Sequence, residues 1–293
     1  MLTSTTLHLR ALERGELPNT VARFGHAAFL ALIESAAPEL SQALHDNNGR
    51  QPFTVSPLRF ADHATTRPLD HSTTRPPDHA TTRLSDHTTR LREGDGCSMR
   101  FTILDSTLFQ SFQSALIASS LAATIRLQNI PFAVEEAITT PHAEELTGYT
   151  TFAELRDAAR DDRAIALRFD SPTALSFNDD AGKKFDLLPT PWRVFDSLCR
   201  KWNAFAETPM VDPKALRAWV EANVLVSGHN IRTEALLFDR FTQKGFVGSV
   251  VYETKSDDAA MLRVVNALAD FALYAGVGYK TTMGMGQTRR VVN

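Results

Sequence analysis

Cysteine is scarce in this chain of 293 residues, and long apolar runs are absent. The only cysteines are Cys97 and Cys199, which lie far apart and form no CxxC pair. A disulfide framework or a zinc site of the usual spacing is therefore not expected, and a reducing compartment fits. No apolar stretch reaches the roughly 20 residues of a membrane span, and residues 1–10 lack the apolar run of a signal peptide. We expect a cytoplasmic protein that does not enter a membrane.

Positive charge is also in short supply. The chain has 31 Lys and Arg against 34 Asp and Glu, a net charge of -3. Nucleic-acid-binding domains often carry a basic balance, so this average argues mildly against one. The segment 271–293 nevertheless contains Lys280, Arg289 and Arg290 and no acidic residue. The distribution of charge therefore leaves nucleic-acid binding open.

An eight-residue repeat interrupts the chain between residues 61 and 95, with units that begin at Asp62, Asp70, Asp78 and Asp86. The repeat is almost devoid of apolar residues and contains prolines, so it cannot bury enough surface to offset its ordering entropy. It also holds four of the nine histidines, but an eight-residue period in a flexible chain fixes no coordination geometry. We predict a disordered insertion, no metal and no cofactor.

The remaining pattern predicts an α+β protein with two tandem ferredoxin-like (βαββαβ) domains. In the first half we expect strands at 3–9, 53–60, 98–104 and 124–134 and helices at 19–36 and 107–120. In the second half we expect strands at 165–177, 223–237, 246–254 and 288–292 and helices at 191–205 and 258–275. The predicted domains span residues 1–145 and 146–293.

A glycine-rich segment follows the last predicted helix and contains Gly276, Gly278, Lys280, Thr281, Gly284 and Gly286. Glycines allow close approach of a phosphate, and successive N–H groups beside a lysine form an anion-binding concavity. A nucleotide P-loop is rejected because it requires Gly directly before Lys and lies between a strand and a helix. A plain turn between the helix and a strand remains the alternative.

Several segments together resemble a known family, the Cas6 endoribonucleases of the RAMP superfamily. They are AGVGYKTTMGMG at 275–286, GHAAFL at 25–30, PEL at 38–40, LHD at 44–46, FTVSPL at 53–58, LPTP at 188–191 and RKWN at 200–203. The resemblance covers nearly the whole chain except the octapeptide repeat. It implies two ferredoxin-like domains and metal-independent cleavage of CRISPR repeat RNA into guide RNAs, which leaves 5′-hydroxyl and 2′,3′-cyclic or 3′ phosphate ends.

The resemblance also bears on partners and rival functions. The expected partner is the precursor RNA, with a second copy of the chain and other CRISPR effector subunits as further candidates. A non-catalytic RNA-binding RAMP subunit of an effector complex is the main alternative. An enzyme that binds mononucleotides through the glycine-rich segment is the third.

Attack of a ribose 2′-OH on the adjacent phosphate requires a base, an acid and cations for the developing charge. The resemblance places catalytic histidines in the N-terminal region, where His26 lies in the first helix and His45 ends a short helix. Arg50 follows in a polar loop and could stabilise the transition state. The alternatives are a helix histidine between core and solvent, a charge that complements the helix dipole, and a loop cation. Which histidine would be base and which acid stays open.

The helix predicted at 191–205 carries Arg193, Arg200 and Lys201 largely opposite its apolar stripe. This basic face could follow an RNA backbone, and an ordinary solvated face is an equal alternative. We therefore add these three residues to the glycine-rich segment as candidates for RNA binding.

Overall fold

The computed structural model describes residues 1–18, 22–47, 49–60, 88–118, 124–180, 182–238 and 241–291. Most of the octapeptide repeat, residues 61–87, lies outside the described residues, and so does the start of the first predicted helix, residues 19–21.

The N-terminal half is a ferredoxin-like unit. Its elements are β1 (Leu2–Ala11), α1 (Ala22–Ala36), β3 (Phe53–Val55), β6 (Gly96–Ile103), α3 (Ser106–Ala118) and β8 (Ile130–Ile138). The antiparallel sheet has the strand order β3-β6-β1-β8-β7, the last strand being β7 (Thr124–Leu127). Smaller elements are β2 (Gly15–Pro18), α2 (Pro38–Asp46), β4 (Arg59–Phe60), β5 (Thr88–Leu91) and β9 (Gly148–Thr150).

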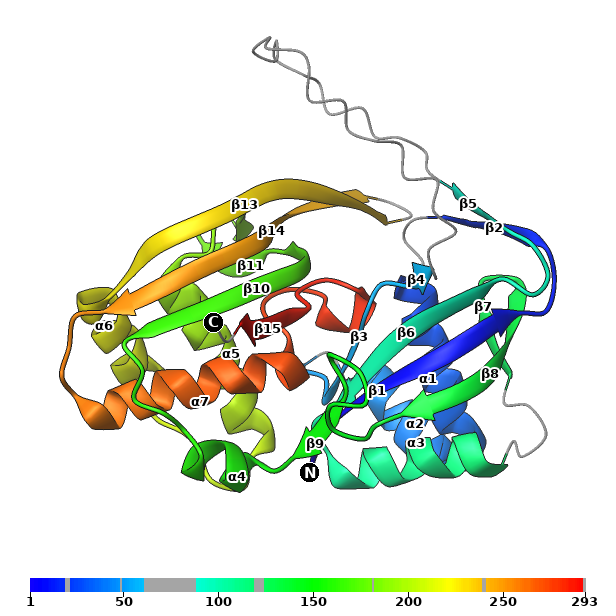
Figure 1. The fold of residues 1–293 in the computed structure, drawn as a ribbon, viewed down its shortest axis with the longest axis horizontal. Coiled ribbons are helices and arrows are strands. Elements are labelled where there is room, and N and C mark those ends of the chain that lie inside the picture. The colour runs from blue at the N-terminus through cyan, green and yellow to red at the C-terminus, as the bar shows by residue number, and fades with distance from the viewer. Residues whose placement is uncertain are drawn as a thin grey trace, which may run out of the picture.

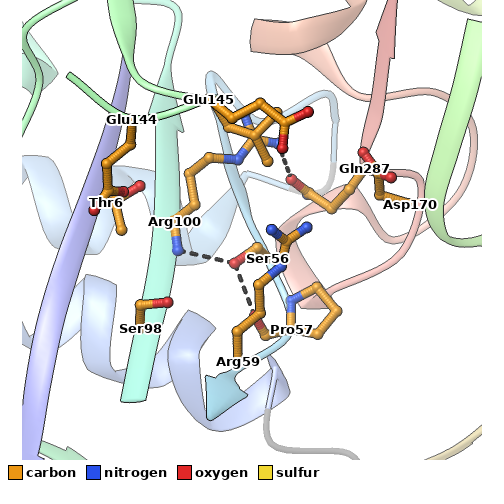
Figure 2. A pocket seen from close by; sticks show the side chains of 11 residues that line it. Thr6, Ser56, Pro57, Arg59, Ser98, Arg100, Glu144, Glu145, Asp170 and Gln287 are labelled. Carbon is orange, nitrogen blue, oxygen red and sulfur yellow. Dashed lines mark hydrogen bonds between the residues drawn. The ribbon is translucent and has the colours of Figure 1, made fainter. Parts of the chain in front are cut away.

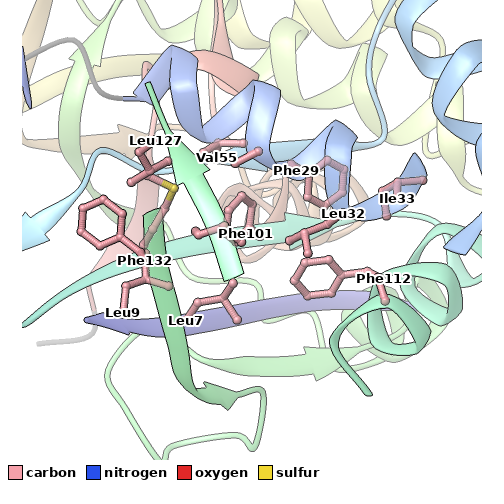
Figure 3. Close-up of a cluster of buried hydrophobic side chains, with 14 of the residues drawn as sticks. Leu7, Leu9, Phe29, Leu32, Ile33, Val55, Phe101, Phe112, Leu127 and Phe132 are labelled. Atoms are coloured by element: carbon pink, nitrogen blue, oxygen red, sulfur yellow. The ribbon is translucent and has the colours of Figure 1, made fainter. Parts of the chain in front are cut away.

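Alternation along β1 and β6 sends one set of side chains against α1 and α3. Leu7 and Leu9 of β1 are buried there with Phe101 of β6, as Figure 3 shows. The ring of Phe29 on α1 stacks on that of Phe53, with 4.3 Å between centroids. This aromatic packing anchors α1, and it fixes the helix that carries His26.

The C-terminal half repeats the unit and confirms the predicted α+β fold. Its elements are β10 (Ala164–Thr173), α5 (Pro191–Phe205), β13 (Val224–Phe238), β14 (Phe241–Thr254), α7 (Ala259–Ala275) and β15 (Thr288–Val291). The strand order is β13-β14-β10-β15, equivalent to that of the first half. Additional elements are α4 (Phe152–Asp157), β11 (Leu175–Asp179), β12 (Gly182–Asp186), α6 (Pro213–Asn223) and the 3₁₀ turn η1 (Thr281–Met283).

Four predicted segments differ from the structure. The strand predicted at 53–60 ends at Val55 and resumes at Arg59 as β4. The strand predicted at 124–134 is a hairpin, because Leu127 pairs with Ile130 and Gln128 adopts a φ of 56° in the two-residue turn. The strand predicted at 165–177 divides after Thr173, and β11 pairs with β12 instead of β14. Residues 88–91, predicted as part of the disordered insertion, form β5 and pair with β2, so that part of the prediction was wrong.

The two halves lie side by side (Figure 1). They dock through a polar network around Arg100, a buried residue of β6 (Figure 2). Its guanidinium donates to the carbonyl of Leu273 on α7, at 3.0 Å, and to Oε1 of Gln287. Gln287 Nε2 donates back to the carbonyl of Val55, at 3.2 Å. A cavity of about 280 Å³ lies beside this network. The division predicted between residues 145 and 146 falls just before β9, which still pairs with β1.

Candidate functional site

A groove of about 1000 Å³ runs between the two halves on the side of α5 and the glycine-rich segment. Its lining residues come from 49–51, from β11 and β12, from α5 and from the glycine-rich segment. Four segments that are distant in sequence therefore meet at one surface. The groove includes Arg50, Arg193, Arg200, Lys201 and Lys280, all of them predicted site residues.

His26 lies on α1 beside the glycine-rich segment. Its ring stacks on Phe53, with 5.5 Å between centroids, and its Nδ1 is buried without a hydrogen-bond partner among the described residues. Burial lowers the pKa of His26 below its usual value, and the charges of His45 and Lys280 lower it further, while a hydrogen bond with the backbone of Thr282 raises it. The neutral imidazole is thus the favoured form.

His45 occupies the last turn of α2, where the helix dipole favours a cation. Leu44 anchors the helix in the core, whereas His45 is exposed. The next loop is tied back by Gln51, whose amide donates to the carbonyls of Leu44, at 3.0 Å, and Asn47, at 2.6 Å. This turn presents Arg50, which is exposed and has no carboxylate partner among the described residues.

The glycine-rich segment owes its glycines to its own fold. Gly276, Gly278, Gly284 and Gly286 all have positive φ, between 61° and 86°. A Cβ on Gly278 would lie 2.4 Å from the carbonyl oxygen of Ala174, and one on Gly286 would lie 2.0 Å from that of Val277. The backbone conformation and the close packing of this segment therefore account for these glycines without a bound phosphate.

Hydrogen bonds within the chain also use most of the N–H groups of this segment. Those of Val277, Gly278 and Tyr279 donate to Gly286, Ser197 and Ala174 respectively. Over the described residues, the N–H groups of Lys280, Thr281, Thr282 and Gly284 have no such partner. The N–H groups that could bind an anion are thus those of η1 and the residues next to it.

Lys280 and Lys183 bring unpaired positive charge to this part of the groove. Lys280 adopts a left-handed conformation, with φ of 54°, and its Nζ lies 4.5 Å from the ring centroid of Phe238. Burial lowers its pKa, and the nearby charge of Lys183 lowers it further. Lys183 Nζ lies 4.0 Å from the ring centroid of Tyr279. Sequence reasoning missed Lys183, because nothing in the pattern predicted that the β11–β12 hairpin folds over the glycine-rich segment.

The three cations predicted on α5 have different environments. The guanidinium of Arg193 lies 3.9 Å from the ring of Phe177 and forms an ion pair with Asp186 at 3.3 Å. Arg200 pairs with Asp196 one turn earlier, at 2.8 Å. Lys201 is buried, so the prediction that it stands on a basic face was wrong. Burial lowers the pKa of Lys201 to about 7, and the charge of Arg50 contributes to the shift.

The described residues contain no group of three or more His, Cys, Asp or Glu side chains that could hold a metal ion. None of their helices is long and apolar enough to cross a membrane.

Two antiparallel βαββαβ halves that share one cationic groove define the class of tandem ferredoxin-like proteins. Comparison with known families narrows this class. Residues 4–156 match the CRISPR Cas6 N-terminal domain, and residues 167–288 match the CRISPR-associated endoribonuclease Cas6. The chain belongs to the Cas6 family, as the sequence resemblance indicated.

Individual relatives agree with the family match. The chain is 27% identical over 150 residues to a CRISPR-associated endoribonuclease Cas6 of Mycobacterium tuberculosis, an alignment that covers 51% of this chain and 46% of that protein. The matched region thus spans about half the length of the curated relative. A Thermus thermophilus Cas6 structure shares 26% identity, with a TM-score of 0.70 and coverage of 99% of this chain and 98% of the other. A Cas6 product complex shares 26% identity, with a TM-score of 0.78 and coverage of 99% and 100%.

Proposed function

We propose that this protein is an endoribonuclease that cleaves CRISPR repeat RNA in a precursor transcript without a metal ion. One observation carries the proposal: the charges of His45 on α2 and of Lys280 in the glycine-rich segment both act on His26 of α1, and Lys280 lines the groove. The family membership and the likeness to a Cas6 product complex support RNA as the substrate. Those relatives supply the substrate class, and the side chains of this chain supply the chemistry.

His26 acts as the general base. Because burial favours its neutral form, it can accept the proton of the attacking 2′-OH near neutral pH. His45 acts as the general acid that protonates the departing 5′-oxygen, since it is exposed at the end of α2, where RNA can reach it. The reaction then leaves a 2′,3′-cyclic phosphate and a 5′-hydroxyl.

Lys280, Lys183 and Arg50 stabilise the negative charge that develops on the phosphorane. In the part of the chain that the structure describes, these three groove cations have no carboxylate partner, so their charge is available to a phosphate. Lys201 has no carboxylate partner there either, but it is buried. Arg193 and Arg200 already neutralise aspartates and contribute less. General acid–base catalysis by His26 and His45 is worth about 10²- to 10⁴-fold in rate for each histidine.

The test is cleavage of labelled CRISPR repeat RNA in EDTA by the wild-type protein and by His26→Ala and His45→Ala. We expect the wild type to cut, and each variant to cut at least about 100-fold more slowly with unchanged RNA affinity. His229→Ala is the matched control, because His229 is exposed on β13 and outside the groove. Replacing the 2′-OH at the cut site by hydrogen should abolish cleavage.

Other outcomes identify the rival functions. Tight binding of repeat RNA without any cut would favour a non-catalytic subunit of an effector complex. A wild-type protein that cuts only when Mg²⁺ is restored would contradict metal independence but not the family.

A further inference from the structure

The buried Lys201 has a chemical environment that the proposed reaction does not explain. Its Nζ donates to the carbonyl of Ala275, the last residue of α7, and to Oγ1 of Thr281, at 3.1 Å. No carboxylate pairs with it among the described residues. A lysine is rarely buried without a counter-ion, since desolvating the ammonium costs free energy that an apolar side chain would not.

Lys201 contacts the residues at both ends of the stretch 275–281. Ala275 precedes that segment and Thr281 begins η1, so one ammonium group ties together residues six positions apart. One turn earlier on α5, Ser197 Oγ accepts a hydrogen bond from the N–H of Gly278, at 3.0 Å. Residues four apart on a helix share a face. Together, Ser197 and Lys201 hold the segment at three points.

The held segment reaches the catalytic histidine. Thr281 is buried. Its methyl group lies 3.2 Å from the position that a Cβ on Gly276 would take and 3.0 Å from the position that a Cβ on Gly286 would take. The next residue, Thr282, forms the backbone hydrogen bond with His26. A continuous series of contacts therefore runs from Lys201 through Thr281 to the imidazole of His26.

We propose that Lys201 is a positioning residue for the reaction: by holding Ala275 and Thr281 it sets the place of η1, and thereby the orientation of His26 and Lys280 at the groove. This inference rests on the proposed function. Lys201 is a positioning residue and not a phosphate ligand, because its ammonium is buried and already donates to Ala275 and Thr281. A displacement of about 1 Å at a reacting group can cost about 100-fold in rate, so a buried contact of this kind can control catalysis.

The test compares Lys201→Met with Lys214→Met in the full chain. Methionine keeps the apolar stem and removes the ammonium, while Lys214 is exposed on α6 away from the groove. We expect Lys201→Met to bind repeat RNA within about threefold of wild type and to cleave it about 10- to 100-fold more slowly in single-turnover reactions. Lys214→Met should match wild type in both. Equal cleavage by Lys201→Met and wild type would overturn the proposal.

Two further variants keep the proposal testable if Lys201→Met does not fold. Thr281→Val removes the acceptor hydroxyl but keeps the side-chain shape, and it should slow cleavage without weakening binding. Where both single variants fold, the double variant should be no slower than the slower single one, since the two changes break the same contact. Independent, multiplied effects would contradict the proposal.

A readout that does not depend on activity separates this proposal from the proposed function. The titration midpoint of the His26 imidazole, followed by NMR, should move in Thr281→Val and Lys201→Met and not in Lys214→Met. A wild type that cuts no RNA would refute the proposed function alone, whereas an unmoved His26 midpoint in both positioning variants would refute the coupling.

Discussion

At the residue scale, His26 shows how a core contact tunes a reactive group. The ring that stacks on Phe53 is the same ring that faces the glycine-rich segment, so the packing that anchors α1 also desolvates the imidazole. Desolvation penalises the charged form and lowers the pKa. His45, on the next helix, is exposed and ends its helix. Two histidines of one sequence region therefore acquire different environments, which suits a base and an acid.

The lowered pKa of His26 predicts the acidic limb of the pH–rate profile. A general base works only when neutral, so on the acidic side kcat/KM should rise with pH, with a midpoint that lies below the usual histidine value of 6.5. The profile should be measured on repeat RNA from pH 4.5 to 8. The limb should disappear in His26→Ala and persist in His229→Ala. A limb with its midpoint above pH 7 in the wild type would contradict the assignment of His26 as base.

Lys201 predicts an unusual dependence of stability on pH. Its pKa is about 7 in the folded protein and near 10.5 in the unfolded chain. Between these values the unfolded state binds more protons, so stability rises with pH and is lost again as pH falls toward 7. The free energy of unfolding of wild type minus that of Lys201→Met should therefore increase from pH 7.5 to 9.5, by up to about 1.4 kcal/mol per pH unit. Urea unfolding of the wild type and of Lys201→Met at each pH measures the two free energies. A difference that does not change with pH would show that Lys201 is not desolvated.

At the element scale, β5 defines where the octapeptide insertion can be removed. β5 pairs with β2, and Leu17 and Leu91 from the two strands are buried in the N-terminal core. A deletion of residues 61–87 with a short Gly-Ser linker should change the melting temperature by only a few degrees, because the removed segment is almost devoid of apolar residues. A deletion of 61–95 should lower it by at least about 5 °C, because it exposes the leucines. Equal losses in the two deletions, measured by calorimetry, would contradict this boundary.

The elements that sequence analysis predicted are those with strong periodicity. The helix at 191–205 was predicted with the bounds that α5 has, since its apolar stripe and the proline at its first position mark it clearly. The split of the predicted strand at 165–177 was missed because both pieces are apolar and only long-range pairing separates them. The hairpin at Gln128 was missed because its turn lacks the Asn-Gly or Asp-Gly sequence that such turns favour.

The candidate site was predicted only in part, because local patterns indicate its helices but not its long-range contacts. His26 and His45 belong to helices that local patterns and the family resemblance both indicate, whereas their approach to Lys280 depends on how the halves dock. Lys201 was placed on the wrong face because a helical projection assigns a lysine to solvent by default. Only the tertiary structure shows that the Lys201 ammonium donates a hydrogen bond to the carbonyl of Ala275.

At the scale of the whole molecule, the proposed catalytic groups come from different halves. His26 and His45 belong to the N-terminal unit and Lys280 to the C-terminal unit, so the groove exists only while the halves stay docked. The docking surface contains a buried polar network. Arg100 is buried there with neutral acceptors, and burial lowers its pKa to about 10. Such a network is stable only while each donor keeps its acceptor.

Substitution of Gln287 measures how far the groove depends on docking of the two halves. It accepts from Arg100 and donates to the carbonyl of Val55, so Gln287→Ala leaves a buried guanidinium short of an acceptor and a buried carbonyl short of a donor. We expect a loss of about 1–3 kcal/mol in the free energy of unfolding, and slower cleavage at a temperature where the variant stays folded, because the histidines and Lys280 lose their fixed relation. Gln110→Ala, on the exposed face of α3, is the control and should change neither quantity. If Gln287→Ala lost stability but cleaved at the wild-type rate, docking would support the fold without setting the geometry of the groove.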